Sequence, residues 1–477
     1  MNKNFLYATY ILILGLSLIA CRAKQSDTFN HSDQNNELQN PNIIFIISDD
    51  QTFSDYSFMG HKHIETPYID QLTRESLTFT RGYVTAPLCS PSLASIISGL
   101  YAQQHGITGN DPLVDHKDDR NYDREAPKGK FLENSYPVQR KKAYQKLSTK
   151  FYKNKLITET LRENGYRSFQ TGKWWVGSAA DAGFDAGMTH GDIHRGARHG
   201  DAGLKIGREG LEPIYNFIED TTNKDKPFFI WYAPFLPHTP HNPPKELEEK
   251  YLKVAPSHSV AKYWAMVEWF DQTTGELLEY LEDEGLAENT IIVYTCDNGW
   301  IQSEDAKGYA PRSKRAPHER GIRTPIMFKY PHKIKPTINK EDLVSNIDIV
   351  PTVMSLLGLN HDDLPGINVL DEKQLSDRQT AFVEVYNHDI INTDNPVESI
   401  HYKVAVEKKW KLIVPNENMV KKEATTRKEN IQGYYSNKEQ LFNLESDPEE
   451  LNNLADENQE IVTRLTEAIN EWWKPSS

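Results

Sequence analysis

Three continuous apolar runs constrain the fold of this chain most strongly. They are N-I-I-F-I-I-S at residues 42–48, P-F-F-I-W-Y-A at residues 227–233 and T-I-I-V-Y-T-C at residues 290–296. A run with so few polar residues is typical of a strand that is buried on both faces of a parallel sheet. Between the last two runs, apolar residues recur at helical spacing: Trp264, Val267, Phe270, Thr274 and Leu278. The pattern predicts an α/β fold with a large, mostly parallel sheet sandwiched by helices.

A change of pattern after about Pro365 predicts a smaller second unit. Short alternating segments at residues 381–386, 401–406 and 410–414 are typical of antiparallel strands. The chain ends in a stretch whose apolar residues share one helical stripe: Ile461, Val462, Leu465, Ile469, Trp472 and Trp473. We therefore predict a main domain over residues 41–370 and a C-terminal subdomain, an antiparallel sheet plus a helix, over residues 371–477. The highly charged residues 111–150 are expected to form a surface insertion.

The N-terminus predicts export. An apolar run follows Lys3 and is too short for an ordinary membrane span, so residues 1–20 are interpreted as a signal peptide. The run closes with Leu-Ile-Ala-Cys, which resembles the bacterial lipobox, and Cys21 would then be lipidated. The polar residues 21–40 would form a tether. We predict a protein anchored by lipid to the cell envelope, at the outer membrane or in the periplasm; a plain signal peptide with an incidental cysteine is the alternative.

The charge balance limits the possible partners. The chain carries 68 acidic and 54 basic residues, for a net charge of −14, which argues against general electrostatic capture of nucleic acid. An anionic substrate therefore needs a local basic site. The three cysteines, Cys21, Cys89 and Cys296, are too few for a disulfide framework. Cys296 lies within an apolar run, and we expect it to pack as a small hydrophobic side chain.

Polar side chains follow two of the buried runs. Asp49 and Asp50 come directly after the first run, and Asp297 and Asn298 come after the third. Ligands of open α/β sheets bind beyond the carboxyl ends of the strands, so these side chains are expected to converge. Their oxygens suit one hard cation, Ca²⁺ or alternatively Mg²⁺. An Asp-Asp turn or a helix cap is the alternative for the first pair alone.

Cys89 begins the segment C-S-P-S-L-A-S-I-I-S-G-L-Y (89–101), which is typical of a helix. A nucleophile at a helix N-terminus lies where the macrodipole favours negative charge. Other segments accompany it in order: N-I-I-F-I-I-S-D-D (42–50), G-K-W-W-V-G (172–177), L-P-H-T-P-H (236–241), T-C-D-N-G (295–299), S-K-R-A-P-H-E-R-G-I-R-T-P (313–325) and L-F-N-L-E-S-D-P-E-E-L-N-N-L-A (441–455). From residue 41 to the end, this set resembles the type I, formylglycine-dependent sulfatases of the alkaline phosphatase superfamily.

The resemblance implies a fold, an activity and a site. A maturation enzyme would oxidise Cys89 to formylglycine (3-oxoalanine), whose hydrated aldehyde supplies the nucleophilic oxygen. The implied metal ligands are Asp49, Asp50, Asp297, Asn298 and the modified Cys89. Lys173 and Lys314 match the lysines that hold the sulfate, and His238 matches the histidine near the leaving oxygen. The expected reaction is removal of sulfate from a sulfated carbohydrate, and residues 41–370 would be the catalytic domain.

The chain departs from the family pattern at two positions. Leu93 stands where the family has an arginine, and Trp175 stands where it has a histidine. Arg315, Arg320 and His105 are candidates to compensate, although a helix-end histidine more often packs against the core.

A basic cluster at residues 190–205, H-G-D-I-H-R-G-A-R-H-G-D-A-G-L-K, offers further candidates for contact with an anionic substrate. They are His194, Arg195, Arg198 and His199, together with Arg315. A flexible loop with cationic side chains is the alternative. Aromatic residues near the motifs could stack on sugars or belong to the core: Trp174, Trp175, Trp231, Tyr232 and Trp300.

Two other functions remain open from the sequence. The same scaffold serves phosphonate and phosphate ester hydrolases, because both anions are tetrahedral and rich in oxygen. A non-catalytic protein that binds sulfated glycans would explain Leu93 and Trp175. Retention of the metal ligands, Cys89 and both lysines speaks against that function.

Overall fold

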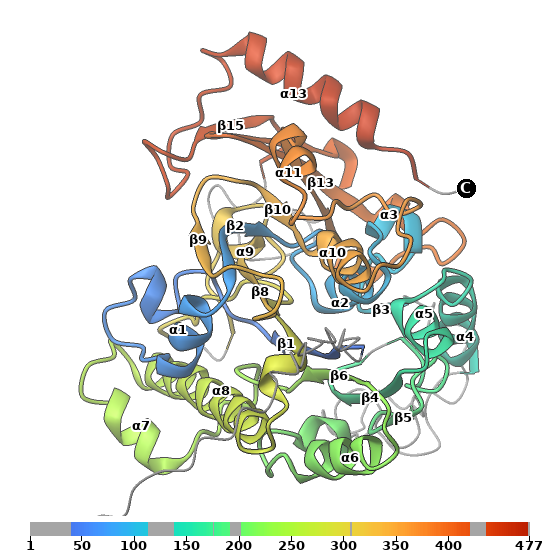
Figure 1. The fold of residues 1–477 in the computed structure, drawn as a ribbon. Coiled ribbons are helices and arrows are strands. Elements are labelled where there is room, and N and C mark those ends of the chain that lie inside the picture. The colour runs from blue at the N-terminus through green and yellow to red at the C-terminus, as the bar shows by residue number, and fades with distance from the viewer. Residues whose placement is uncertain are drawn as a thin grey trace, which may run out of the picture. The chain divides into compact units, whose positions relative to one another are not determined.

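The computed structural model describes residues 40–112, 138–174, 176–190, 202–305, 308–419 and 436–475. These residues build a large sheet in the order β10-β2-β8-β7-β1-β6-β4-β5, with β9 beside β2 (Figure 1). Its strands are β1 (Asn42–Ser48), β2 (Leu77–Tyr83), β4 (Arg167–Gly172), β5 (Ala186–Gly187), β6 (Phe228–Ala233), β7 (Thr290–Cys296), β8 (Arg323–Lys329), β9 (Thr337–Asn339) and β10 (Val344–Ser345). Strand β8 runs antiparallel to β7 and β2, and the other pairs are parallel. The prediction of an α/β fold with a mostly parallel sheet is confirmed.

Strand β1 lies in the middle of this sheet, and all of its residues are buried. Ile44 pairs with Ile292 of β7 on one side and with Ile230 of β6 on the other. Ile43, Phe45 and Ile47 face one core cluster, and Ile44 and Ile46 face another. The three continuous apolar runs are therefore β1, β6 and β7, and each is apolar because both faces of the sheet are covered.

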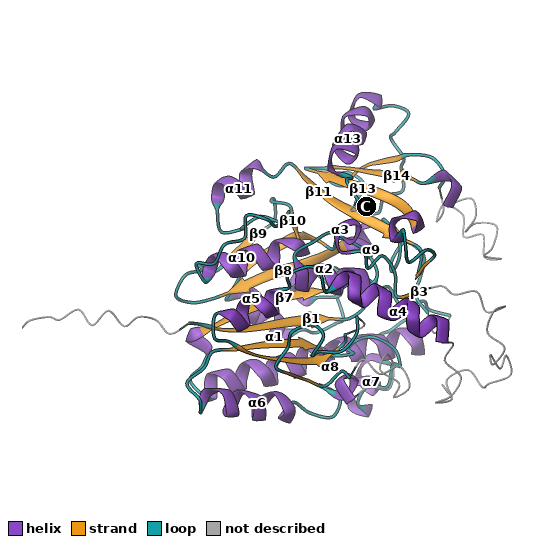
Figure 2. Ribbon diagram, turned by 90° about the vertical axis from the view of Figure 1, so that its right-hand side faces the viewer, coloured by secondary structure: helices purple, strands orange, loops and turns teal. Residues whose placement is uncertain are grey.

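Helices cover both faces. The first core cluster packs under α2 (Cys89–Ser98), α4 (Val138–Phe151), α5 (Ile157–Glu163) and α10 (Ile349–Leu356). The second packs under α1 (Pro67–Arg74), α6 (Glu212–Thr222) and α8 (His258–Asp283), which confirms the helix predicted between β6 and β7 (Figure 2). Shorter helices lie in the connections: α3 (Ala102–His105), α7 (Lys245–Tyr251), α9 (Glu319–Ile322) and α11 (Glu372–Asp377).

The C-terminal part contains the expected antiparallel sheet. Its order is β11 (Thr380–Tyr386), β13 (Ile400–Glu407), β14 (Trp410–Pro415) and β15 (Gln440–Asn443). Helix α13 (Gln459–Trp472) covers one face with Val462, Leu465 and Ile469. The other face packs against Tyr83, Val84 and Ile322 of the main part. The small sheet thus lies between its own helix and the main part of the fold.

A buried ion-pair cluster joins the two sheets. The Lys411 ammonium, which is fully buried, lies 3.3 Å from a Glu319 carboxylate oxygen and 2.7 Å from one of Glu450. Glu450 also accepts the Glu319 N–H at 2.8 Å. Because Glu319 belongs to α9 and Lys411 to β14, these contacts join the C-terminal sheet to the short helix that directly precedes β8.

The predicted surface insertion at residues 111–150 is only partly described. Residues 113–137 lie outside the described residues, and α4 replaces the last part of the expected insertion. Leu147 and Phe151 of this helix are buried in the core, whereas Lys141, Lys142 and Lys146 are exposed, so the helix lies at the surface and packs through its apolar side. The predicted signal peptide and tether also lie outside the described residues, because the description begins at residue 40. Within the described ranges, no helix has the length and apolar character needed to cross a membrane.

Candidate active site

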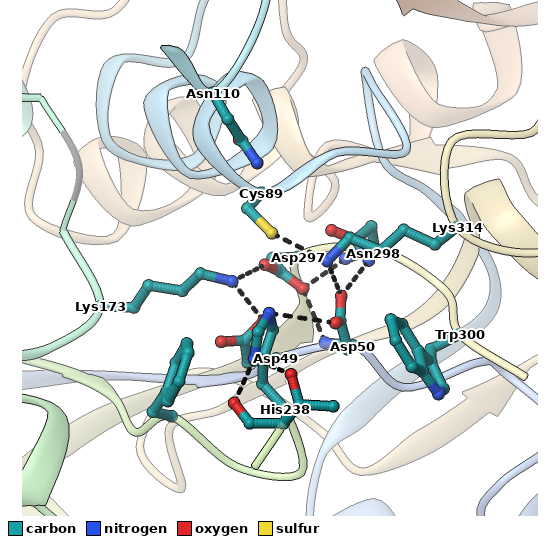
Figure 3. Close-up of polar contacts among 12 residues, drawn as sticks. Asp49, Asp50, Cys89, Asn110, Lys173, His238, Asp297, Asn298, Trp300 and Lys314 are labelled. Carbon is teal, nitrogen blue, oxygen red and sulfur yellow. Dashed lines mark hydrogen bonds and ion pairs between the residues drawn. The ribbon is translucent and has the colours of Figure 1, made fainter. Parts of the chain in front are cut away.

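The residues that follow four neighbouring strands lie at one edge of the sheet. Asp49 and Asp50 follow β1, and Asp297 and Asn298 follow β7. On the other side of β1, the residues after β6 lead to His238, and Lys173 directly follows β4. Since these strands are parallel neighbours, residues that are distant in sequence meet at their carboxyl ends (Figure 3).

Cys89 faces this group from the first residue of α2. Its Sγ lies 3.1 Å from Nζ of Lys314, which comes from the loop between β7 and α9. The Lys314 ammonium also lies 2.5 Å from Oδ1 of Asp50. The structure thus brings together all the predicted metal ligands and the four residues predicted to be catalytic, and the least buried of the lysines and carboxylates is Lys314, at 6% exposure.

The carboxylates and lysines form one connected network. Lys173 pairs with Asp49, and its Nζ lies 3.0 Å from Oδ2 of Asp297. Oδ1 of Asp297 accepts the Asp50 N–H at 3.0 Å and the Asn298 N–H at 2.7 Å. The Asn298 amide donates to Asp50 Oδ1 at 2.6 Å. Asp297 therefore fixes the backbone on which the other oxygens are carried.

These residues fit a divalent cation. Asp49, Asp50, Cys89 and His238 each offer a ligand atom within 4.8 Å of the others. Among the described residues, Asp49 Oδ2, Asp50 Oδ2 and Asn298 Oδ1 are buried without a hydrogen-bond partner. Buried acceptors without a donor are costly, and a hard cation satisfies oxygens of this kind.

The charges of the site are shifted by burial. Burial raises the pKa of Asp49 well above its usual range, although Lys173 opposes the effect. Burial works against ionisation of Asp50 too, but Lys314, His238 and Lys173 hold its pKa at about 2. Burial raises the pKa of the Cys89 thiol to about 11 despite both lysines, so an unmodified Cys89 is protonated at neutral pH and is a poor nucleophile.

Two glycines allow the strand ends to approach so closely. A Cβ on Gly172, just before Lys173, would lie 1.9 Å from the carbonyl oxygen of Ala233, and Gly172 has a positive φ of 73°. A Cβ on Gly299 would lie 1.9 Å from the carbonyl oxygen of Arg320. At Gly299 the need is close packing of backbones rather than a left-handed turn. Asp50 itself adopts the left-handed region, with φ of 67°.

Comparison with known proteins assigns the family. The family model described as Sulfatase matches residues 41–359, which is most of the chain. This chain belongs to the sulfatase family. A second model, described as the C-terminal region of N-sulphoglucosamine sulphohydrolase, matches residues 309–474.

The relatives of this sulfatase come from bacteria and from mammals. A sulfatase of Formosa agariphila is 26% identical, covering 88% of this chain and 85% of its own. The N-acetylgalactosamine-6-O-sulfatase of Bacteroides thetaiotaomicron is 24% identical, covering 96% and 97%. Among solved structures, Ps i-CgsB in complex with k-i-k-neocarrahexaose superposes with a TM-score of 0.67 at 23% identity, covering 92% of this chain and 94% of that one. These structures share the fold of the sulfatase described here.

The residues suggested to compensate for the two departures lie in different places. Leu93 is buried in the core cluster beneath α2. His105 is also buried: its Nε2 lies 3.1 Å from Ser95 Oγ, and burial lowers its pKa to about 3. His105 packs against α2 through Ser95, in agreement with the alternative that a helix-end histidine packs against the core. Arg320 pairs with Glu449 at 2.8 Å.

Arg315 remains close to the cysteine segment through its backbone. Its N–H donates to the Pro87 carbonyl at 2.9 Å, and its guanidinium lies 3.5 Å from the Tyr309 hydroxyl. The other predicted substrate residues, His194, Arg195, Arg198 and His199, lie outside the described residues, as does Trp175.

The aromatic residues considered for sugar stacking belong to the core. Trp174, Trp231, Tyr232 and Trp300 are at most 5% exposed. Cys296 is buried as expected, and its thiol lies 3.2 Å from the Asn298 carbonyl.

Sequence reasoning missed Asn110 and its partners. Asn110 Oδ1 accepts the Ser90 N–H at 3.0 Å, and Asn110 points toward Cys89 (Figure 3). Its other side lies against His388, whose Nδ1 is 2.6 Å from Asp389, where β3 (Asp111–Pro112) and β12 (Asp389–Ile390) pair. The sequence carries no signal for this contact, because it joins loops some 280 residues apart.

Proposed function

We propose that this sulfatase hydrolyses a sulfate ester on a carbohydrate, with Cys89 oxidised to formylglycine and one divalent cation beside it. The observation that carries the proposal is the placement of Cys89 at the first residue of α2, against Lys314 and beside the buried oxygens of Asp49, Asp50 and Asn298 that accept no hydrogen bond. A pure binding protein has no need of this combination.

The residues of the chain have distinct parts in the proposed reaction. Asp49, Asp50, Asp297 and Asn298 hold the cation, which is proposed to be Ca²⁺, with Mg²⁺ as the alternative. Bound there, the cation offsets negative charge on the sulfate and on the attacking oxygen. Formylglycine at position 89 carries that oxygen on its hydrated aldehyde.

The lysines and the histidine surround the proposed sulfate position. Lys173 and Lys314 bind its oxygens, since their ammonium groups enter the site from opposite sides, Lys314 against Cys89 and Lys173 against Asp49 and Asp297 (Figure 3). His238 approaches from below, with Nε2 3.4 Å from Asp50 Oδ2, and lies at the leaving oxygen. Its Nδ1 donates to the Thr239 carbonyl at 2.7 Å, which orients the ring.

A sulfated carbohydrate is the proposed substrate class. The support is the printed function of relatives that match nearly the whole chain, including the N-acetylgalactosamine-6-O-sulfatase, and the oligosaccharide bound by Ps i-CgsB. The alternative, a phosphonate or phosphate ester hydrolase on the same scaffold, is separated from it by assaying matched sulfated and phosphorylated sugars in parallel.

Mass spectrometry of the peptide containing Cys89 tests the mechanism. Active protein is expected to carry the aldehyde, and Cys89→Ala is expected to lose at least ~10³-fold in turnover. Cys89→Ser is expected to be nearly inactive, because a serine ester of sulfate lacks the second hydroxyl that expels sulfate. An unmodified thiol in a fully active preparation would contradict the proposal and favour the phosphate alternative.

We also propose, from the sequence of residues 1–40, that the protein is exported and anchored through a lipidated Cys21, at the outer membrane or in the periplasm. The proposed oxidation of Cys89 requires a separate partner, a maturation enzyme that forms formylglycine. Membrane fractions and detergent phases are expected to retain the wild type, whereas Cys21→Ser is expected to be released or left unprocessed. Recovery of the wild type wholly in the soluble fraction contradicts the anchor.

A further inference from the structure

Arg208 binds the backbone of the loop that carries His238. Its Nε and Nη2 donate to the Phe235 carbonyl at 3.2 and 2.7 Å, and Nη2 donates to the His238 carbonyl at 3.0 Å. The Pro240 carbonyl accepts from the same guanidinium at 3.3 Å, and the Asn242 side chain accepts from Nη1. One side chain therefore holds residues 235–242, which we call the His238 loop.

The same loop is joined to the metal site from its other side. The Leu236 carbonyl, between two carbonyls that Arg208 holds, accepts the Asp49 N–H at 2.9 Å. The His238 imidazole stacks on the Phe235 ring, with centroids 4.2 Å apart. A shift of the loop would thus displace both His238 and the backbone of Asp49.

Two aromatic rings and a backbone turn surround Arg208. Its guanidinium lies between the Phe235 and Trp269 rings, 6.0 and 5.8 Å from their centroids. Its backbone belongs to a tight turn in which the Gly207 N–H donates to the Gly210 carbonyl at 3.0 Å. Among the described residues, no carboxylate forms an ion pair with Arg208, so its hydrogen bonds to this loop are its main polar contacts there.

We propose that Arg208 is a positioning residue that sets the places of His238 and Asp49 by fixing the carbonyls of residues 235, 238 and 240. The expected effect of Arg208 on turnover rests on the proposed function, whereas its hydrogen bonds to the His238 loop do not depend on that function. Planar guanidinium donors suit several converging carbonyls, whereas a lysine ammonium at the same place cannot reach all of them.

Steady-state kinetics of Arg208→Met and Arg208→Lys test the proposal. Both variants are expected to lower kcat on the order of 10–100-fold with KM changed by less than about threefold, because misplacement of groups by about 1 Å costs rates of that size. In the double variant Arg208→Met/His238→Ala, the combined loss is expected to be smaller than the product of the two single losses, because the part of the Arg208 effect that acts through His238 is already gone and only the part that acts through Asp49 remains. Full recovery in Arg208→Lys would show a charge effect, and additive losses would show independence; either result overturns the proposal.

Hydrogen–deuterium exchange provides a readout without turnover. Arg208→Met is expected to speed exchange of the Asp49 amide and of peptides from the His238 loop, with peptides of α6 unchanged. Arg81→Met is the matched control, since Arg81 also donates to backbone carbonyls, those of Glu341 and Lys408, in an exposed setting. Arg81→Met is expected to leave both kcat and the exchange rate of the His238 loop unchanged. Faster exchange of the loop in Arg208→Met, together with a wild type that has no sulfatase activity, would support the positioning role of Arg208 and reject the proposed function. Unchanged exchange of the loop in Arg208→Met would reject the positioning role.

Discussion

Asp297 shows how much of the site one residue can organise. Its carboxylate accepts the backbone N–H groups of Asp50 and Asn298 and pairs with Lys173. Asp50 has a left-handed backbone that only short polar residues and glycine adopt readily, and the hydrogen bond from its N–H to Asp297 holds it there. Asp297 is thus both a proposed metal ligand and a support for the ligands Asp50 and Asn298.

Replacing Asp297 is therefore expected to affect metal binding and turnover together. Asp297→Asn should lower turnover by about 10³-fold or more and abolish the rise in Tm that Ca²⁺ gives the wild type after removal of metal with a chelator. Thermal unfolding with and without Ca²⁺ measures this. Asp271→Asn is the control, because Asp271 caps α1 through the Ile69 N–H at 2.8 Å and should keep the Ca²⁺-dependent rise. An Asp297→Asn protein with an unchanged Ca²⁺ response would contradict the ligand assignment.

Among the elements, α2 depends on packing from several directions. Its first residue faces the site, Leu93 lies in the core, and Ser95 bonds Thr85 at 2.7 Å and His105 at 3.1 Å. The helix therefore presents Cys89 from a rigid base.

Restoring the family arginine at position 93 is expected to damage this base. Leu93→Arg would place a charge among Ile96, Ile97 and their neighbours, and should lower the free energy of unfolding by at least about 2 kcal/mol. Leu93→Met, which keeps the volume, should cost less than about 1.5 kcal/mol. Urea unfolding compares them. A Leu93→Arg protein that is as stable as the wild type and more active would show that the side chain reaches the site.

The elements also show what the sequence can predict. β1, β6, β7 and α8 follow from their apolar patterns, and the neighbouring positions of β1 and β7 follow from the matching acidic ends. The antiparallel direction of β8 and the core helix α4 were not predicted, because neither has a distinctive local pattern. Arg208 and Asn110 were missed for another reason: Arg208 binds mostly backbone carbonyls, which carry no sequence signal, and Asn110 contacts a histidine that is distant in sequence.

At the scale of the whole molecule, buried carboxyls join the C-terminal sheet to the main part. Glu384 of β11 is fully buried and accepts the Gln103 N–H at 3.1 Å. Burial raises its pKa to about 8. In the unfolded chain the group ionises near pH 4.3, so between that pH and 8 the folded state binds more protons than the unfolded state. Its contribution to stability is complete at low pH and is lost as the pH rises toward 8.

Glu384→Gln is expected to flatten this dependence. From pH 5 to pH 8, the Tm of the variant should rise relative to that of the wild type, by the equivalent of up to about 1.4 kcal/mol per pH unit. Calorimetry across that range measures the difference. The exposed Glu372→Gln serves as the control and should run parallel to the wild type. Parallel curves for Glu384→Gln would contradict the raised pKa.

The meeting of four strand ends has a consequence for how the protein comes into being. Asp49 and the Asp297 that supports its neighbour are separated by almost 250 positions, and Lys314 is added later still. Contacts of such long sequence separation form slowly, since the intervening chain must first be ordered. A nascent chain that has emerged only as far as β6 contains Asp49, Asp50, Cys89 and Lys173 but lacks the other residues of the site. The proposed activity therefore appears only after β7 and the loop that carries Lys314 have joined the sheet, in addition to the oxidation of Cys89.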